Sequence, residues 1–323
     1  MNNFSKTLMI LGFALMVISL AFTKFNLQKI YQPLIDQNNE KYTFKEKNII
    51  PSEDFKIILN SSNQNISIVA TERSDIHIEY YDADDDYYEF TETDNSITIK
   101  NKVKIRWFDF TFFSPNIRIE VPIDFFINYD VSSSNGSIEI FGTGLPGMDL
   151  SLNESKFKTS NGKIISKNLF SNEKIELVTS NSRIEVINSD INDIYVKTSN
   201  GTIEFKNSKA DIINGKTSNS KIIIDHVETS NYINFETSNG RIELNSLNAK
   251  DIKLKTSNAK IEGSIIGDYD DFDKDIKTSN GRIYVNETEY SNKINSNNSK
   301  ENKLNIKTSN SKINLEFIKK ADL

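Results

Sequence analysis

The chain has 323 residues, of which 37% are hydrophobic and 26% are charged, and its formal net charge is −6. This composition is typical of an ordered body with a polar surface and excludes a wholly disordered chain. Cysteine is absent, which excludes a disulfide framework and thiolate catalysis. The net negative charge argues against nucleic acid as a partner.

The N-terminus carries an apolar segment. Residues 7–23 (TLMILGFALMVISLAFT) are 17 uncharged residues between Lys6 and Lys24, which is at the short end for a membrane-spanning helix. They are interpreted either as a signal peptide that is cleaved near residues 19–21 or as a retained signal anchor. We favour a transmembrane anchor over residues 1–24, because only one lysine precedes the run and Phe22 follows the cleavage site. A buried N-terminal helix is a third interpretation, but nothing in this β-rich sequence is suited to cover it. We therefore expect a single-pass protein of the cell membrane with an extracytoplasmic body.

Two further regions precede the regular part of the chain. Residues 25–50 are polar with a central proline and are interpreted as a linker. Residues 51–130 contain segments in which apolar and polar residues alternate, such as 57–70 and 96–100, and this alternation predicts strands. Because a stacked fold needs atypical terminal units to protect its end edges, residues 51–130 are predicted to form an N-terminal β capping region.

Residues 131–323 repeat a corner of the form Thr-Ser-Asn-Gly/Ser-Lys/Arg-Ile about every twenty residues. The corner asparagines are Asn135, Asn161, Asn181, Asn200, Asn219, Asn239, Asn258, Asn280 and Asn310. An isoleucine follows each of them three positions later, from Ile138 to Ile313. A period near twenty is the signature of a stack of similar units.

The positions around each corner predict two strands per repeat. Apolar residues lie six and four positions before the asparagine, and three and usually five positions after it, as in Ile194, Val196, Ile203 and Phe205. Spacing by two places these side chains on one face of a strand. Asn and Gly accept positive φ, so the corner can bend sharply, and stacked asparagines can form a hydrogen-bonded ladder. The sequence therefore predicts an all-β parallel β-solenoid (β-helix) with coils of about 20 residues. A further Thr-Ser-Asn at 229–231 is predicted to mark the opposite bend of one coil.

These repeats carry a resemblance to a known family. The strand that ends in Val121-Pro122, the segment Ser134–Ile140 (SNGSIEI) and the serial T-S-N/G-x-I units resemble the putative-adhesin β-strand-repeat family, a domain of unknown function. The resemblance covers about residues 50–323. It implies the solenoid fold and a membrane-anchored protein common in low-GC Gram-positive bacteria. It implies no catalytic, cofactor or binding residues.

Basic residues recur beside the corners. One row lies two positions after the asparagine and another lies three before it, as in Lys255 and Lys307. Because stacking aligns each row, one edge of the solenoid is predicted to be basic and to hold an anionic cell-wall polymer. Glutamates two residues further on can instead pair with these cations and leave a solvated face. The candidate contacts are Lys163, Arg183, Lys221, Arg241, Lys260 and Arg282.

An aromatic segment lies within the capping region. Its members are Trp107, Phe108, Phe110, Phe112 and Phe113. So many rings exceed what one face of a strand can bury, so the segment is either an exposed tip that contacts an envelope protein or the membrane, or a plug that covers the first coil.

Signals for metal binding and catalysis are weak. Acidic clusters at 82–89 and 267–275 are compatible with Ca²⁺ or with solvated loops, and neither has the spaced ligands of a Ca²⁺ loop. With two histidines far apart and no catalytic motif, we expect no cofactor and no enzyme. The sequence favours a non-enzymatic binding, adhesin-like or envelope-sensing module. A polysaccharide-acting β-helix enzyme and a structural spacer are the alternatives.

Overall fold

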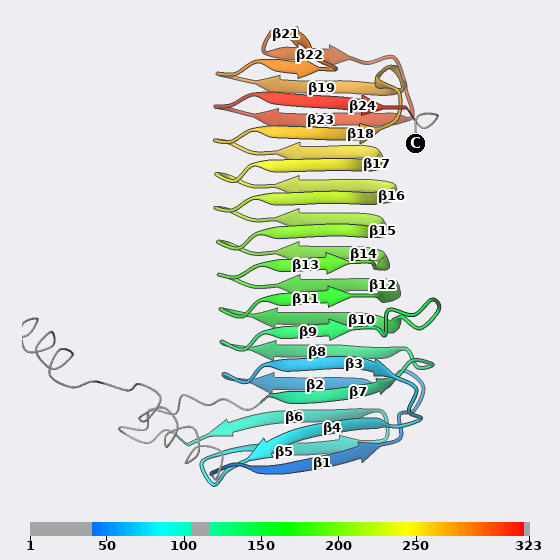
Figure 1. Cartoon of the computed structure of the whole chain (residues 1–323), viewed down its shortest axis with the longest axis vertical. Coiled ribbons are helices and arrows are strands. Elements are labelled where there is room, and N and C mark those ends of the chain that lie inside the picture. The colour runs from blue at the N-terminus through cyan, green and yellow to red at the C-terminus, as the bar shows by residue number, and fades with distance from the viewer. Residues whose placement is uncertain (1–40, 105–115, 320–323) are drawn as a thin grey trace, which may run out of the picture. The chain divides into compact units, whose positions relative to one another are not determined.

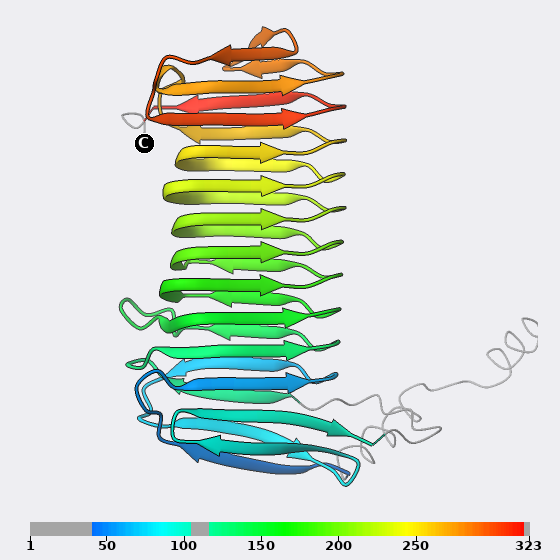
Figure 2. The same ribbon diagram turned by 180° about the vertical axis from the view of Figure 1, so that it is seen from behind.

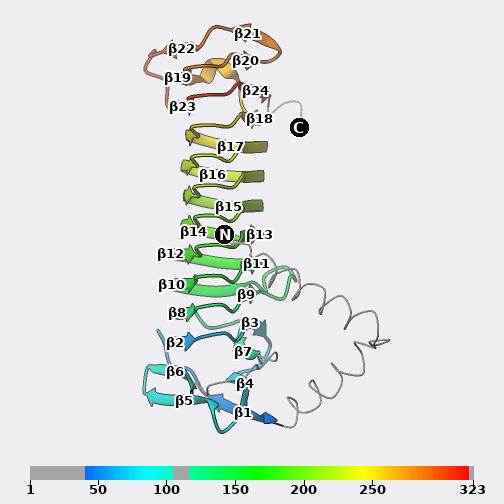
Figure 3. The same cartoon turned by 90° about the vertical axis from the view of Figure 1, so that its left-hand side faces the viewer.

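The computed structural model describes residues 41–104 and 116–319 as strands stacked in coils (Figure 1). Each central coil has one strand before and one strand after its Thr-Ser-Asn corner. Strands of the same kind pair in parallel between neighbouring coils, both before and after the corners. The two resulting stacks lie side by side in Figure 3. The predicted all-β solenoid of mostly parallel strands is confirmed.

The central strands have the following bounds. The strands before corners are β8 (Ile127–Ser133), β10 (Leu150–Thr159), β12 (Leu169–Val178) and β14 (Asp190–Lys197). The strands after corners are β9 (Ile138–Phe141), β11 (Ile164–Lys167) and β13 (Ile184–Ile187). Three strands run from one corner to the next through both stacks, namely β15 (Ile203–Lys216), β16 (Ile222–Glu236) and β17 (Ile242–Lys255).

The core is built on columns, meaning residues at equivalent positions of successive coils. The isoleucine three positions after each corner asparagine is fully buried. In-register pairing joins these isoleucines into one column, which Ile117 extends at one end. The order is Ile117, Ile66, Ile138, Ile164, Ile184, Ile203, Ile222, Ile242, Ile261, Ile313 and Ile283. Burial of one such side chain stabilises the fold by about 1.5–3 kcal/mol, so the column explains why isoleucine recurs at this position.

The corners project along one edge of the stack (Figure 2). Each corner asparagine after the first donates its side-chain amide to the asparagine of the preceding corner in the stack, and nine such bonds of 2.6–2.8 Å link ten residues. In spatial order these are Asn63, Asn135, Asn161, Asn181, Asn200, Asn219, Asn239, Asn258, Asn310 and Asn280. Asn63, in the expected capping region, supplies a further corner that the twenty-residue repeat does not predict.

The corner threonines are buried and tie each coil to its neighbour. Thr198 donates from Oγ1 to the Ser182 carbonyl oxygen (3.1 Å) and accepts from the Gly201 amide (3.1 Å). No corner asparagine has a positive φ, so the expectation that positive φ makes the corner is wrong. Gly201 is required for space instead, because a Cβ there would lie 1.6 Å from the Ser182 carbonyl oxygen.

The bend at the other end of the coil uses the left-handed conformation. It recurs seven positions after the corner asparagine, at Asn168, Asn188, Asn207, His226 and Ser246, with φ between 48° and 57°. The predicted bend at 229–231 is therefore misplaced by three residues. In β16 those residues form a bulge, since two residues separate Thr229 from Tyr232 where one separates the partners Ala210 and Ile212 in β15.

Both ends of the stack contain a coil that is out of chain order. At one end, β2 (Lys56–Ser61) and β3 (Ile66–Thr71) form a coil that lies between two coils made later in the chain. One of these is formed by β6 (Ser96–Val103) and β7 (Ile117–Pro122), and the other by β8 and β9. At the other end, β23 (Asn302–Thr308) and β24 (Ile313–Ile318) form a coil that lies between two coils made earlier in the chain. One of these is formed by β17 and β18 (Ile261–Ile266), and the other by β19 (Phe272–Thr278) and β20 (Ile283–Val285). Figure 1 shows this red coil between yellow and orange ones.

Antiparallel strands lie beyond the outermost coils. At one end β4 (Ile76–Asp82) pairs with β7, β5 (Asp86–Thr93) with β6, and β1 (Thr43–Ile49) with β4. At the other end β21 (Thr288–Tyr290) pairs with β20 and β22 (Lys293–Ser296) with β19, and the 3-10 helix η1 (Tyr269–Asp271) precedes β19. The expected boundary at residue 131 falls inside β8, and the expected capping region contains the full coil β2–β3.

The predicted transmembrane helix over residues 1–24 and most of the predicted linker lie outside the described residues. Within residues 41–104 and 116–319, no helix combines the length and the apolar character that a membrane span requires.

Candidate functional site

The six predicted polyanion contacts lie in one column on the corner edge. The column begins with Lys163 and Arg183 and is interrupted by Thr202. Five basic residues then follow in five neighbouring coils, in the order Lys221, Arg241, Lys260, Lys312 and Arg282, as the backbone hydrogen bonds between these coils show. The interleaved last coil places Lys312 inside the row, where chain order would have put it last.

Glutamates accompany most of these cations. Lys163 pairs with Glu139 (2.9 Å) and Arg183 with Glu185 (2.8 Å). Arg241 contacts Glu243, Lys260 contacts Glu262, and Arg282 lies 3.6 Å from Glu289. Lys221 and Lys312 have no ion pair within the described residues. The predicted alternative of a paired, solvated face thus describes five of the six candidates, while the sixth, Lys221, and Lys312 of the β23–β24 coil have no carboxylate partner within the described residues.

A second basic column lies on the other side of the corners. Lys255, Lys307 and Lys277 are adjacent in register, and Lys216 lies two coils before Lys255. Lys307 pairs with Asp275 (2.6 Å) and Lys216 lies 3.9 Å from Glu236, whereas Lys255 and Lys277 have no ion pair in the described part of the chain. We call the part of the two columns from Lys216 and Lys221 onward the basic corner edge. Its members are Lys216, Lys221, Arg241, Lys255, Lys260, Lys277, Arg282, Lys307 and Lys312.

The other two predicted features are the aromatic segment and the acidic clusters. Trp107, Phe108, Phe110, Phe112 and Phe113 lie outside the described residues, so neither a tip nor a plug is tested. In the acidic clusters, Asp82 pairs with Lys45 (2.9 Å) and Asp273 accepts from two backbone amides (2.7 and 3.0 Å). Among the described residues, no group of three or more His, Cys, Asp or Glu is placed to hold a metal ion.

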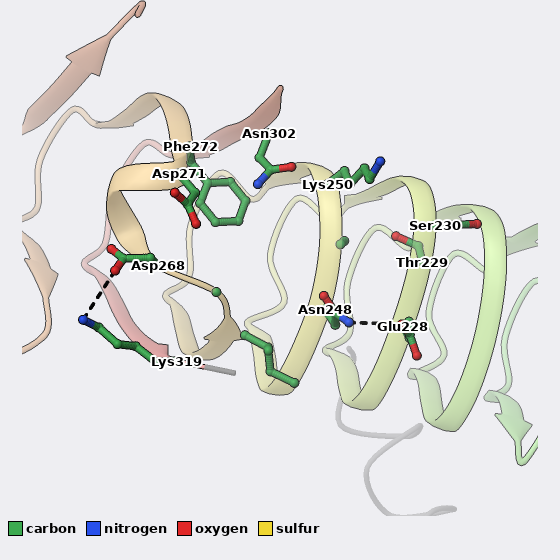
Figure 4. Close-up of a pocket in the computed structure, with 13 residues that line it drawn as sticks. Glu228, Thr229, Ser230, Asn248, Lys250, Asp268, Asp271, Phe272, Asn302 and Lys319 are labelled. Atoms are coloured by element: carbon green, nitrogen blue, oxygen red, sulfur yellow. Dashed lines mark hydrogen bonds and ion pairs between the residues drawn. The ribbon is translucent and has the colours of Figure 1, made fainter. Parts of the chain in front are cut away.

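Sequence reasoning missed a groove on the narrow side of the coils, between the left-handed bend and the bulge. One part has a volume of about 620 Å³ and the other about 330 Å³, and Glu228 and Ser230 line both. Figure 4 shows the larger part, where Asn248 reaches Glu228 and Lys319 reaches Asp268. We call this the side groove. It runs from Phe170 in β12 to Phe272 in β19.

The stacked parallel coils, with a hydrogen-bonded asparagine ladder at one edge, define a β-solenoid protein. The chain belongs to the Toastrack DUF4097 family, a domain of unknown function, whose profile matches residues 55–317. This confirms the predicted resemblance at the level of the family. No curated protein matches significantly.

Several solved structures are similar over most of the chain. A putative cell adhesion protein from Clostridium sporogenes is 11% identical and covers 86% of this chain and 100% of its own, with a TM-score of 0.30. A putative adhesin from Bacteroides fragilis is 11% identical and covers 85% of this chain and 97% of its own, with a TM-score of 0.37. A putative adhesin from Parabacteroides merdae is 13% identical and covers 87% of this chain and 97% of its own, with a TM-score of 0.36. A putative lipid binding protein from Parabacteroides distasonis (11%; 87% and 98%) has a TM-score of 0.26. At these scores the likenesses carry no argument about function.

Proposed function

We propose that the chain is a non-enzymatic binding module of the cell envelope, held at the membrane by residues 1–24 with its solenoid outside the cytoplasm. Its basic corner edge binds an anionic cell-wall polymer, such as a phosphodiester chain of the teichoic acid type. The observation that carries the proposal is the run of five basic residues in five neighbouring coils.

The geometry of the edge suits a linear polyanion better than a single small anion. Neighbouring coils are about 4.8 Å apart, so the columns present positive charge at regular intervals along the stack. Each exposed ion pair contributes only about 0–1 kcal/mol, and affinity therefore requires many contacts in series. The lysines without carboxylate partners in the described residues, Lys221, Lys255, Lys277 and Lys312, lose no existing ion pair when the polymer binds.

The test measures binding of purified poly(glycerol phosphate) to the full chain in a neutral detergent. A variant with glutamine at Lys221, Lys255, Lys277 and Lys312 is expected to bind at least about tenfold more weakly, because four charge contacts are lost. Binding by the unmodified chain is expected to weaken as salt screens the contacts.

A matched variant controls for net charge. It carries glutamine at four lysines that already pair with carboxylates away from the corner edge, namely Lys45, Lys47, Lys102 and Lys206. This variant is expected to retain binding. An equal loss in both variants, or no salt-sensitive binding by the unmodified chain, contradicts the proposal.

A further inference from the structure

The side groove exists because its floor is lined with small residues. Three residues of each coil span the narrow side, and the middle one points inward. Across four neighbouring coils these middle residues are in register: Ile191, Ala210, Thr229 and Ala249, all less than 9% exposed. Three of the four are small, so the surface is hollow at Ala210, Thr229 and Ala249 while exposed side chains on either side form the walls.

The walls carry both hydrogen-bond donors and acceptors. One wall is a column of Asp190, Lys209, Glu228 and Asn248. The other contains Asn172, Asn192, Asp211, Ser230, Lys250 and Asn302. The groove is lined in seven neighbouring coils, from β12 to β19, which is a length of about 29 Å at the strand spacing. This length accommodates several units of an extended polymer.

The charges in the walls exclude the ligand proposed for the corner edge. The lysines of the side groove are paired: Lys209 with Glu228 (3.8 Å), Lys250 with Glu301 (2.7 Å) and Lys319 with Asp268 (3.4 Å). Asp190, Asp211 and Asp271 have no ion pair within the described residues, so negative charge exceeds positive charge along the groove. Burial raises the pKa of the nearby Asp149 carboxyl, and the Asp190 charge raises it further. A polyanion is repelled here, whereas a ligand rich in hydroxyl groups can donate to carboxylates and accept from amides.

One group beneath the groove lacks a partner. Thr229 is 4% exposed and lines the larger part, and its hydroxyl oxygen makes no hydrogen bond within the described residues. Leaving a buried hydroxyl unsatisfied is unfavourable.

We propose that the side groove is a second binding site, separate from the basic corner edge, that takes a linear, uncharged polysaccharide along the stack. Sugar hydroxyls bond to Glu228, Asn248 and the other wall residues, and the small floor residues let the chain lie close to the backbone.

The test titrates the full chain with neutral hexasaccharides of different linkage (cellohexaose, maltohexaose and laminarihexaose) and with polygalacturonate, using calorimetry. At least one neutral hexasaccharide is expected to bind. The double variant Glu228→Ala with Asn248→Ala is expected to weaken that binding at least about tenfold. It removes the charged acceptor Glu228 and the Asn248 amide, and the sugar hydroxyls lose their hydrogen bonds to both. Ser230→Tyr, which fills the groove from the exposed side, is expected to weaken it as well.

Two controls separate this site from folding and from the corner edge. Glu204→Ala with Asn214→Ala alters half-buried residues on the long faces of the same coils and is expected to leave binding unchanged. The four-lysine variant of the corner edge is also expected to bind the hexasaccharide normally, even if the polyanion proposal fails. The proposal is overturned if no neutral hexasaccharide binds, if the Glu228 and Asn248 variant binds as well as the unmodified chain, or if polygalacturonate occupies the groove instead.

Discussion

The buried threonines of the corners are expected to stabilise the stack more than the exposed asparagine ladder does. Thr198, 1% exposed, bonds through Oγ1 to the Ser182 carbonyl (3.1 Å) and the Gly201 amide (3.1 Å). Thr198→Val keeps the shape of the side chain but leaves both backbone groups without this partner. Since each unsatisfied buried group costs about 1–3 kcal/mol, we expect the free energy of unfolding to fall by about 2–4 kcal/mol.

The comparison is Asn200→Ala in the same corner. It removes two ladder bonds, to Asn181 (2.8 Å) and from Asn219 (2.7 Å). These side chains are exposed, so water replaces the lost partners. The backbone amide of residue 200 keeps its hydrogen bond to the Ser180 carbonyl (3.0 Å). We expect a loss of about 0.5–1 kcal/mol.

Equilibrium unfolding in urea measures both changes, with Thr198→Ser as the control that keeps the hydroxyl. Hydrogen exchange of the Gly201 amide gives a local readout, since that amide loses its acceptor only in the valine variant. The reasoning is refuted if Asn200→Ala destabilises the chain as much as Thr198→Val does, because the ladder would then be the main stabilising feature of the corner.

Two further predictions concern packing and backbone strain. Gly215→Ala places a Cβ 2.0 Å from the Phe235 ring and is expected to destabilise the chain by about 1–3 kcal/mol; Phe235→Leu should restore part of this loss in a double-mutant cycle of urea unfolding, and simple additivity would contradict the clash. Ser246, at φ 57°, is in a conformation that glycine adopts without strain, so Ser246→Gly is expected to raise the unfolding free energy by about 0.5–1 kcal/mol. The same change at Asn188 (φ 49°) should give a smaller gain, since asparagine tolerates this region, and a larger gain there would show that relief of strain is not the cause.

The sequence predicts the parts of the fold that depend on one repeat and its neighbour. The isoleucine column, the asparagine ladder and the two strands per coil all follow from residues at fixed distances from Asn200 and its equivalents. The left-handed bend was harder to find, because His226 and Ser246 stand where three other coils have asparagine. The corner at Asn63 was missed because Gln64 follows it in place of glycine or serine.

The order of the coils could not be predicted, because similar corners can stack on one another in any order. Nothing local to Asn310 shows that it binds Asn258 and Asn280 rather than lying beyond both. The composition of the basic corner edge depends on this order, since Lys312 joins the row only through it. The side groove depends on register across coils, which brings Ala210, Thr229 and Ala249 together from positions 19 and 20 residues apart.

The interleaved coil β23–β24 closes a gap between coils whose strands precede it in the chain. Strands β17 to β20 are made first, and their facing edges have no partner until residues 302–318 arrive between them. Unpaired strand edges are templates for pairing with other chains. A chain cut short before Asn302 therefore retains two adhesive edges within its stack, whereas a chain that includes β24 closes them. Residues 302–318 therefore protect the edges of two coils at once.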